Sequence, residues 1–102
     1  MRIIKPKRLR ELAERYPAVA ESLEKWYQLV RHAHWDSLHD ARRVYPHADA
    51  VIVESGKTVT VFNIGGNKYR LIVAIHYNTQ CVYILDLLTH AEYDKNFWKG
   101  SL

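Results

Sequence analysis

Residues 58–87, TVTVFNIGGNKYRLIVAIHYNTQCVYILDL, decide the fold, because apolar and β-branched side chains recur there in three strand-length runs. The runs cover residues 58–63, 69–77 and 81–87. They are joined by two short polar turns, Gly65-Gly66-Asn67 and Asn78-Thr79-Gln80. Turns this short connect neighbouring antiparallel strands, so the stretch predicts an antiparallel meander.

The run at residues 69–77 predicts a strand that is covered on both of its faces. Leu71, Val73 and Ile75 point to one side of such a strand, whereas Ile72 and Ala74 point to the other. A further run at residues 50–54 precedes the first turn, Ser55-Gly56-Lys57. The sequence therefore predicts a small antiparallel sheet of about four strands.

The residues before the sheet predict helices. Leu9, Leu12 and Ala13 recur at helical spacing after Pro6, and this helix is expected to end at Tyr16-Pro17. From Pro17 to residue 31, apolar residues recur at positions i, i+4, i+7 and i+11, which predicts a second helix. The two form a helical hairpin that covers the sheet, and residues 36–44 form a short helix or a turn.

The C-terminal region predicts one more short helix. Thr89 is followed three residues later by Glu92, which is the pattern of a capping box. His90 and Tyr93 therefore lie in the first turns of that helix. The predicted fold class is α+β, with residues 1–102 forming a single domain.

Composition limits the functional classes. The formal net charge is +4 and the pI is about 9.3, which modestly favours an anionic partner such as nucleic acid. The one cysteine, Cys81, excludes an intrachain disulfide scaffold. The sequence contains neither an apolar run long enough for a membrane span nor a signal peptide, and a cytoplasmic location is expected.

Two polar clusters carry the candidate chemistry. Arg70 offers a planar fork for phosphate oxygens, and Lys68 stands two positions earlier, where a regular strand would place it on the same face. His90 and Tyr93 stand at i, i+3, so both can reach one nucleotide as acid and base. The side chains expected to contact phosphate or RNA are Lys68, Lys95, Asn67 and Asn63.

Each candidate also has a structural interpretation. Arg70 can form an ion pair at a strand end, His90 can be an exposed helix-start residue, and Tyr93 can pack its ring on the sheet. Asn63 and Asn67 flank the Gly65-Gly66 turn, so turn geometry accounts for them as well as RNA contact does. A zinc site is disfavoured, because the spacing of His32, His34, His39 and His47 does not converge on one helix face.

Three segments together resemble the HigB family of bacterial toxins. They are residues 62–71 (FNIGGNKYRL), the apolar run Val82-Tyr83-Ile84, and residues 88–94 (LTHAEYD). The resemblance implies a RelE-like fold, in which helices pack on an antiparallel sheet. It also implies ribosome-dependent cleavage of messenger RNA, growth arrest, and a HigA-type antitoxin with a helix-turn-helix DNA-binding region. In this chain Thr58, Thr60 and Asn63 occupy the strand where some RelE relatives carry lysines.

The chemistry of RNA cleavage agrees with these residues. RNA carries its own nucleophile, the 2′-hydroxyl, so cleavage requires proton transfers and charge stabilisation but neither a metal ion nor another cofactor. We expect Arg70 to stabilise the phosphate and His90 to accept a proton or a hydrogen bond. Tyr93 can orient the 2′-hydroxyl, transfer its proton or stack on a base, and the sequence does not separate these roles. Two alternatives remain open: a non-catalytic RNA- or protein-binding module, and a gyrase-directed toxin on the same fold.

Overall fold

A computed structural model describes all 102 residues and contains one five-stranded sheet in the order β1-β5-β4-β3-β2. The strands are β1 (Arg2–Ile4), β2 (Asp49–Ile52), β3 (Thr58–Ile64), β4 (Tyr69–His76) and β5 (Cys81–Thr89). The α-helices are α1 (Pro6–Arg15), α2 (Ala20–Arg31), α3 (Leu38–Val44) and α4 (His90–Asp94). Short 3₁₀ turns occupy Pro17–Val19, Tyr77–Thr79 and Phe97–Gly100.

The predicted α+β class is confirmed, but the sheet is larger and mixed. The strands β2 to β5 form the predicted antiparallel meander. The additional strand, β1, pairs in parallel with β5, with Arg2 opposite Cys81. Three residues are too few to display a period of two, so a strand this short leaves no recognisable pattern in the sequence.

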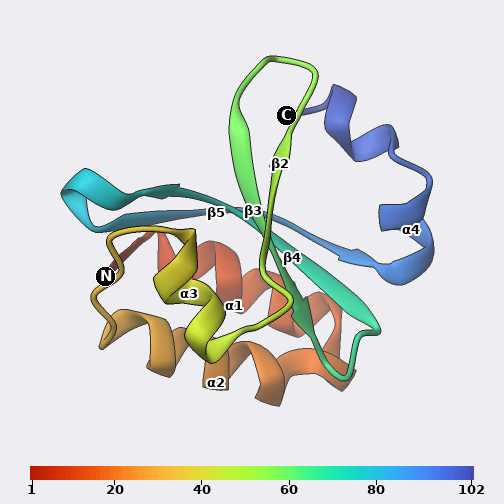
Figure 1. Ribbon diagram of the computed structural model, residues 1–102. Coiled ribbons are helices and arrows are strands. Elements are labelled where there is room, and N and C mark those ends of the chain that lie inside the picture. Colours follow the sequence, from red (N-terminus) through yellow and green to blue (C-terminus); the bar gives the residue numbers. More distant parts are fainter.

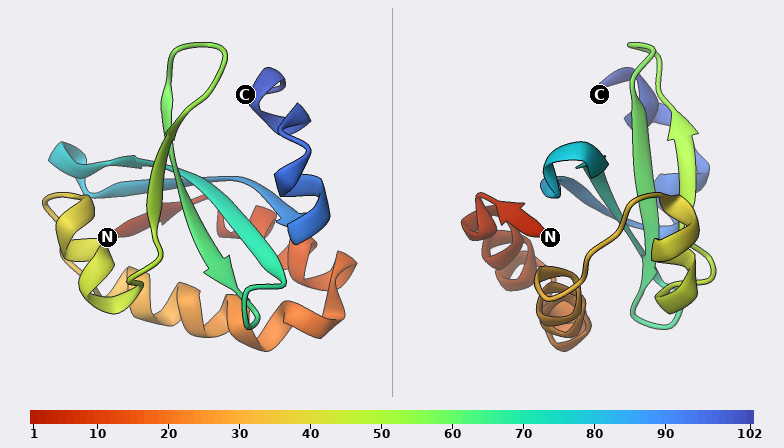
Figure 2. Two further views of the ribbon diagram at one scale, coloured as in Figure 1. Left: turned by 45° about the vertical axis from the view of Figure 1, so that its right-hand side comes forward. Right: turned by 60° about the vertical axis from the view of Figure 1, so that its left-hand side comes forward.

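The helices α1 and α2 lie side by side and cover one face of the sheet, as Figures 1 and 2 show. Their apolar stripes pack against the inward side chains of the central strands in one cluster of 17 buried residues. Trp26 and Phe62 are fully buried there, whereas Tyr27, which follows Trp26 in α2, is only partly buried. This layer is the helical hairpin that the sequence predicts.

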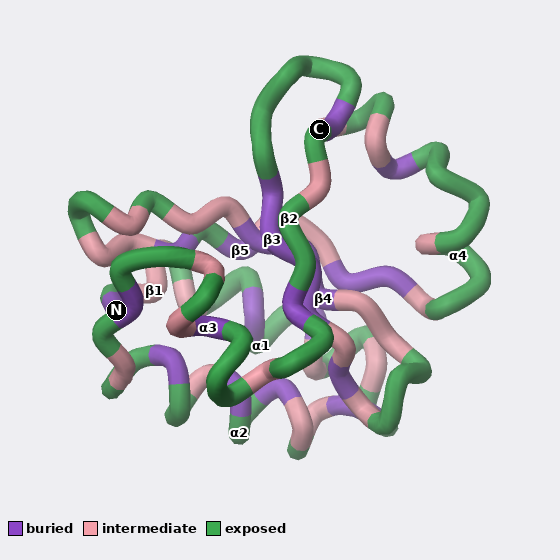
Figure 3. The backbone as a smooth tube through the Cα atoms, viewed as in Figure 1, coloured by how far each residue is buried: buried purple, intermediate pink, exposed green.

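The opposite face of the sheet carries a smaller cluster. Its six buried residues include Ile72 from β4, Leu88 from β5 and Trp98 from the C-terminal turn. Only α4 and the segment after it cross this face, so much of it is open to solvent, while the buried positions follow the central strands (Figure 3). The strand β4 is thus covered on both faces at its centre, as predicted, because Leu71, Ile72 and Val73 are all fully buried.

Local geometry fixes the turns that border the open face. The capping box predicted at the start of α4 is present, because Thr89 accepts a hydrogen bond from the Glu92 amide and the Glu92 carboxylate accepts one from the Thr89 amide. Gly65, in the β3–β4 turn, has a positive φ of 65°. A Cβ atom there would lie 3.1 Å from Val19, so conformation and space both favour glycine.

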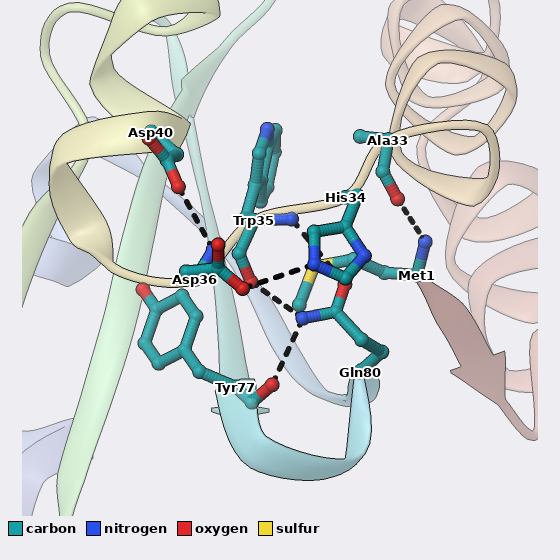
Figure 4. A network of polar contacts seen from close by, with 8 residues as sticks. All are labelled: Met1, Ala33, His34, Trp35, Asp36, Asp40, Tyr77 and Gln80. Atoms are coloured by element: carbon teal, nitrogen blue, oxygen red, sulfur yellow. Dashed lines mark hydrogen bonds and ion pairs between the residues drawn. The ribbon is translucent and has the colours of Figure 1, made fainter.

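Gln80, at the end of the β4–β5 connection, ties that connection to the segment after α2 (Figure 4). Its side-chain amide donates to the carbonyl oxygens of Trp35 at 2.6 Å and of Tyr77 at 2.8 Å. Its side-chain oxygen accepts from the Trp35 amide at 3.3 Å, and its backbone carbonyl accepts from the Arg2 amide at 2.6 Å. One residue therefore links β1, β5 and the loop that carries Trp35.

Replacing Gln80 should destabilise the protein. We expect Gln80→Ala to lower the free energy of unfolding by about 2–3 kcal/mol, because two half-buried backbone groups of Trp35 lose their partners. Gln28→Ala is the matched control, since Gln28 is exposed and bonds only Glu24, and it should change stability by less than about 0.5 kcal/mol. Urea unfolding of both variants measures the difference. Equal effects would show that the network contributes nothing specific.

Candidate active site

The candidate site lies on the open face of the sheet, where β3 and β4 approach their connecting turn. Asn63 follows Val61 by two residues, and Arg70 precedes Ile72 by two. Val61 and Ile72 belong to the open-face cluster, so the alternation along a strand places Asn63 and Arg70 on that same face. The two are also opposite each other in the β3–β4 register.

Arg70 is held by one nitrogen and leaves the rest of its fork unpaired. Its Nη1 donates to the backbone carbonyl of Asn67 at 2.7 Å and to that of Tyr69 at 3.2 Å. No carboxylate lies within ion-pair distance, and neither Nε nor Nη2 has a protein acceptor. The structural alternative of an ion pair is therefore wrong. The geometry leaves a fixed, partly exposed cation with open donors.

The Tyr93 ring lies beside Arg70 and packs on Trp98. The guanidinium carbon of Arg70 is 5.6 Å from the ring centroid of Tyr93. The ring also stacks on Trp98, with centroids 5.2 Å apart and planes inclined by 19°, while the Trp98 indole nitrogen donates to the Tyr93 carbonyl. Tyr93 therefore packs on the sheet and also reaches the candidate site.

The environment of Tyr93 keeps its hydroxyl protonated. Burial of the ring raises the pKa of Tyr93 above its usual value of 10.0. The carboxylate of Asp49 raises this pKa further, Arg70 opposes the shift, and Asp94 adds to it. At neutral pH the phenol is consequently a hydrogen-bond donor and not a general base.

His90 forms an exposed pair with a carboxylate on the same helix. Its Nδ1 lies 2.9 Å from a carboxylate oxygen of Asp94, one helical turn away. When Nδ1 carries the proton and donates to Asp94, Nε2 presents a lone pair toward solvent. The His90 amide also donates to the Lys68 carbonyl at 2.9 Å, so the start of α4 is tied to the β3–β4 turn.

The predicted phosphate-binding residues differ in what the structure shows for them. Lys68 lies in the turn before β4, so the expectation that it shares one strand face with Arg70 is wrong: the turn of residues 65–68 delays the start of the strand. Lys68 and Lys95 are both exposed and form no ion pair. Asn63 donates to Asn67 at 3.2 Å across the turn. The two amides therefore brace the loop whose carbonyl holds Arg70.

Sequence reasoning missed three residues of this site. Asp94 stands four residues after His90, and its i, i+4 spacing on a short helix was a usable signal. Asp49, at the start of β2, acts on Tyr93 across the sheet and pairs with Arg42 at 3.3 Å. Trp98 is buried under Tyr93. Asp49 is remote from Tyr93 in sequence, so no local pattern indicates it, and Trp98, five residues after Tyr93, follows the end of α4, where helical spacing no longer applies.

The histidines outside the site do not gather around a metal position. His34 lies 3.0 Å from Asp36, an exposed pair at the end of the loop after α2. No cluster of three or more His, Cys, Asp or Glu side chains with metal-binding geometry is present. None of the helices combines the length and apolar character that a bilayer crossing requires.

Comparison with known proteins identifies the family of the chain. The profile of the HigB toxin family, RelE-like toxic components of toxin-antitoxin systems, matches residues 19–96. The mRNA interferase toxin HigB of Escherichia coli K12 is 29% identical over 94 residues, which cover 92% of this chain and 88% of that protein. The mRNA interferase HigB of Escherichia coli O6:H1 is 27% identical, with 93% and 90% covered. The family match spans Gly65-Gly66, Arg70 and the helix α4, and the chain therefore belongs to the HigB family of toxins.

Proposed function

We propose that this toxin is a ribosome-dependent endoribonuclease that cuts messenger RNA without a metal ion or cofactor, using the substrate 2′-hydroxyl as the nucleophile. The observation that carries the proposal is the anchored but open fork of Arg70 beside a protonated Tyr93. The names of the similar proteins, which are mRNA interferases, support the same activity.

Arg70 binds the scissile phosphate. Its Nη1 is already committed to the turn carbonyls, so Nε and Nη2 donate to two non-bridging oxygens without reorganisation of the side chain. The negative charge on these oxygens grows as the five-coordinate phosphorane forms. A preorganised cation at that place therefore stabilises the transition state more than the ground state.

His90 takes the proton of the 2′-hydroxyl. Asp94 holds Nδ1 in its protonated form, which leaves Nε2 as the acceptor. As the proton moves to Nε2, the 2′-oxygen forms a bond to phosphorus, and the charge of Asp94 stabilises the resulting imidazolium. In this role Asp94 positions His90 and does not itself contact the RNA.

Tyr93 completes the reaction on the opposite side of the phosphorus. Its phenol stays protonated at neutral pH and donates a proton to the departing 5′-oxygen as the phosphorus–oxygen bond breaks. The products are a 2′,3′-cyclic phosphate and a 5′-hydroxyl end. Lys68 and Lys95, exposed on either side of α4, contact the neighbouring phosphates, whereas Asn63 and Asn67 contact RNA only after they give up their mutual hydrogen bond.

The biological setting follows from the same proposal. The partner is a HigA-type antitoxin with a helix-turn-helix region, through which the complex meets DNA, and residues 1–102 act as a single toxin domain. The toxin works in the cytoplasm on translated messages, so growth arrest results from message loss. The basic charge of α1, from Lys7, Arg8, Arg10 and Arg15, supports contact with ribosomal RNA.

Replacing Tyr93 tests whether the protein is an enzyme. Tyr93→Phe keeps the ring on Trp98 but removes the proton, so cleavage should fall by about 100-fold while ribosome binding is retained. The measurement is 5′-end mapping of a defined message in a purified translation system, with and without ribosomes. Tyr27→Phe, on the helical face, is the control and should cut normally. Intact message with wild-type protein still bound to ribosomes would leave only a binding module.

Comparing the arms of that test with and without ribosomes separates two further outcomes. Cuts within codons only when ribosomes are present would support ribosome dependence. Equal cutting of free RNA would contradict it, even though the endoribonuclease activity itself would stand.

The protonation state of Tyr93 can be tested by titration. In Asp49→Asn, the pKa of Tyr93 should fall, because a carboxylate that disfavours the phenolate is lost; in Arg70→Gln it should rise, because the stabilising cation is lost. Carbon NMR of ring-labelled tyrosine from pH 8 upward gives both values. The Tyr45 pKa is raised by burial alone, so its value should be the same in both variants as in the wild type. Unchanged Tyr93 values would show that neither charge acts on the ring.

A further inference from the structure

The open face of the sheet has a hollow that lies away from the turn that holds Arg70. It has a volume of about 620 Å³ and is lined mainly by apolar side chains, among them Val59, Leu85 and Leu102. The same side chains belong to the open-face cluster that includes Tyr93. The hollow and the candidate active site are therefore parts of one continuous surface.

The spacing along β4 relates the two places. Ala74 lines the hollow, and it stands four residues after Arg70, which corresponds to about 13 Å along the strand. That distance spans a short stretch of single-stranded RNA, so one strand can touch both places. A volume of this size lies within the range of about 300–1,000 Å³ that is typical of small-ligand sites.

Two aromatic rings form the wall of the hollow. Tyr83 and His76 come from adjacent strands, with ring centroids 5.1 Å apart and planes inclined by 55°. Tyr83 is 39% exposed on the open face of the sheet. Exposed aromatic rings on an open sheet are the surfaces on which single-stranded bases stack.

The charge around the hollow suits a polyanion. Lys57 is the cationic side chain of its lining, and no Asp or Glu side chain lines it. A base can therefore enter the apolar part while a phosphate of the same strand lies near Lys57.

We infer that this hollow is a base-binding subsite, in which a nucleotide flanking the cleaved bond stacks on Tyr83 and His76. The inference rests on the proposed function, because it takes RNA as the substrate. It adds the role of Tyr83, which cleavage chemistry at Arg70 and Tyr93 does not require. The subsite provides binding and sequence preference at one position beside the cut.

Fluorescent bases test the subsite directly. The substrate is a short message whose target codon carries 2′-O-methyl groups, because these groups block cleavage. A single 2-aminopurine replaces the base at successive positions of the message. The message is bound to ribosomes that are stalled with an empty acceptor site. Stacking should quench the fluorescence at one position with wild-type protein. Tyr83→Ala should abolish that quenching and weaken RNA binding by about tenfold, whereas Tyr83→Phe, which keeps the ring, should preserve both.

Phe97→Ala provides the matched control, because Phe97 is an aromatic residue that is 82% exposed and does not line the hollow. It should leave the quenching unchanged. The subsite is contradicted if no position is quenched, or if Tyr83→Ala quenches like the wild type. It is likewise contradicted if Tyr83→Ala weakens only the complex with the antitoxin, since a protein segment would then occupy the hollow.

A parallel assay with unmodified message separates the two proposals. If the wild-type protein cuts the message but quenching does not depend on Tyr83, the subsite is wrong and the cleavage function stands. If quenching depends on Tyr83 but the wild-type protein cuts nothing, the subsite stands and the cleavage function fails.

Discussion

The aromatic packing around Phe62 is the constraint on which the rest of the structure depends. Its ring centroid lies 5.6 Å from that of Trp26, 6.1 Å from that of Trp35 and 5.3 Å from that of Tyr45. These rings come from α2, from the loop after it and from the segment after α3, so one side chain of β3 joins three separate segments to the sheet. Because interiors are densely packed, these contacts also fix which face of β3 points toward the helices. Asn63, the next residue, then points to the opposite face, toward the candidate site.

The helix α4 depends on tertiary contacts at both of its ends. Its five residues are too few to form a stable helix in isolation. On one side it continues directly from β5 at Thr89, where the capping box begins. On the other, the C-terminal segment bonds the β2–β3 hairpin, through the Glu54 amide to the Lys99 carbonyl at 3.1 Å and the Ser55 hydroxyl to the Leu102 carbonyl at 3.0 Å. These attachments hold His90 and Tyr93 over the sheet.

The candidate site places the two proposed proton-transfer groups in different surroundings. Tyr93 is packed between the sheet and Trp98, and burial keeps its phenol protonated. The His90–Asp94 pair is more than half exposed, where an ion pair contributes little to stability. The pair therefore contributes little to holding the fold together, and in the proposed reaction it orients the imidazole. Arg70 lies between these extremes, with one nitrogen bonded to the turn and the others open.

The sequence by itself determined the elements and most of the candidate side chains. Periodic apolar residues predicted α1, α2 and the meander, the Thr89 and Glu92 pair predicted the start of α4, and Arg70, His90 and Tyr93 were recognisable by their chemistry. Tertiary structure alone decided the parallel pairing of β1, the position of Lys68 in a turn, and the action of Asp49 on Tyr93. The reason is physical: periodicity and capping act between residues a few positions apart, whereas sheet order, burial and long-range charge depend on contacts between residues far apart in the chain.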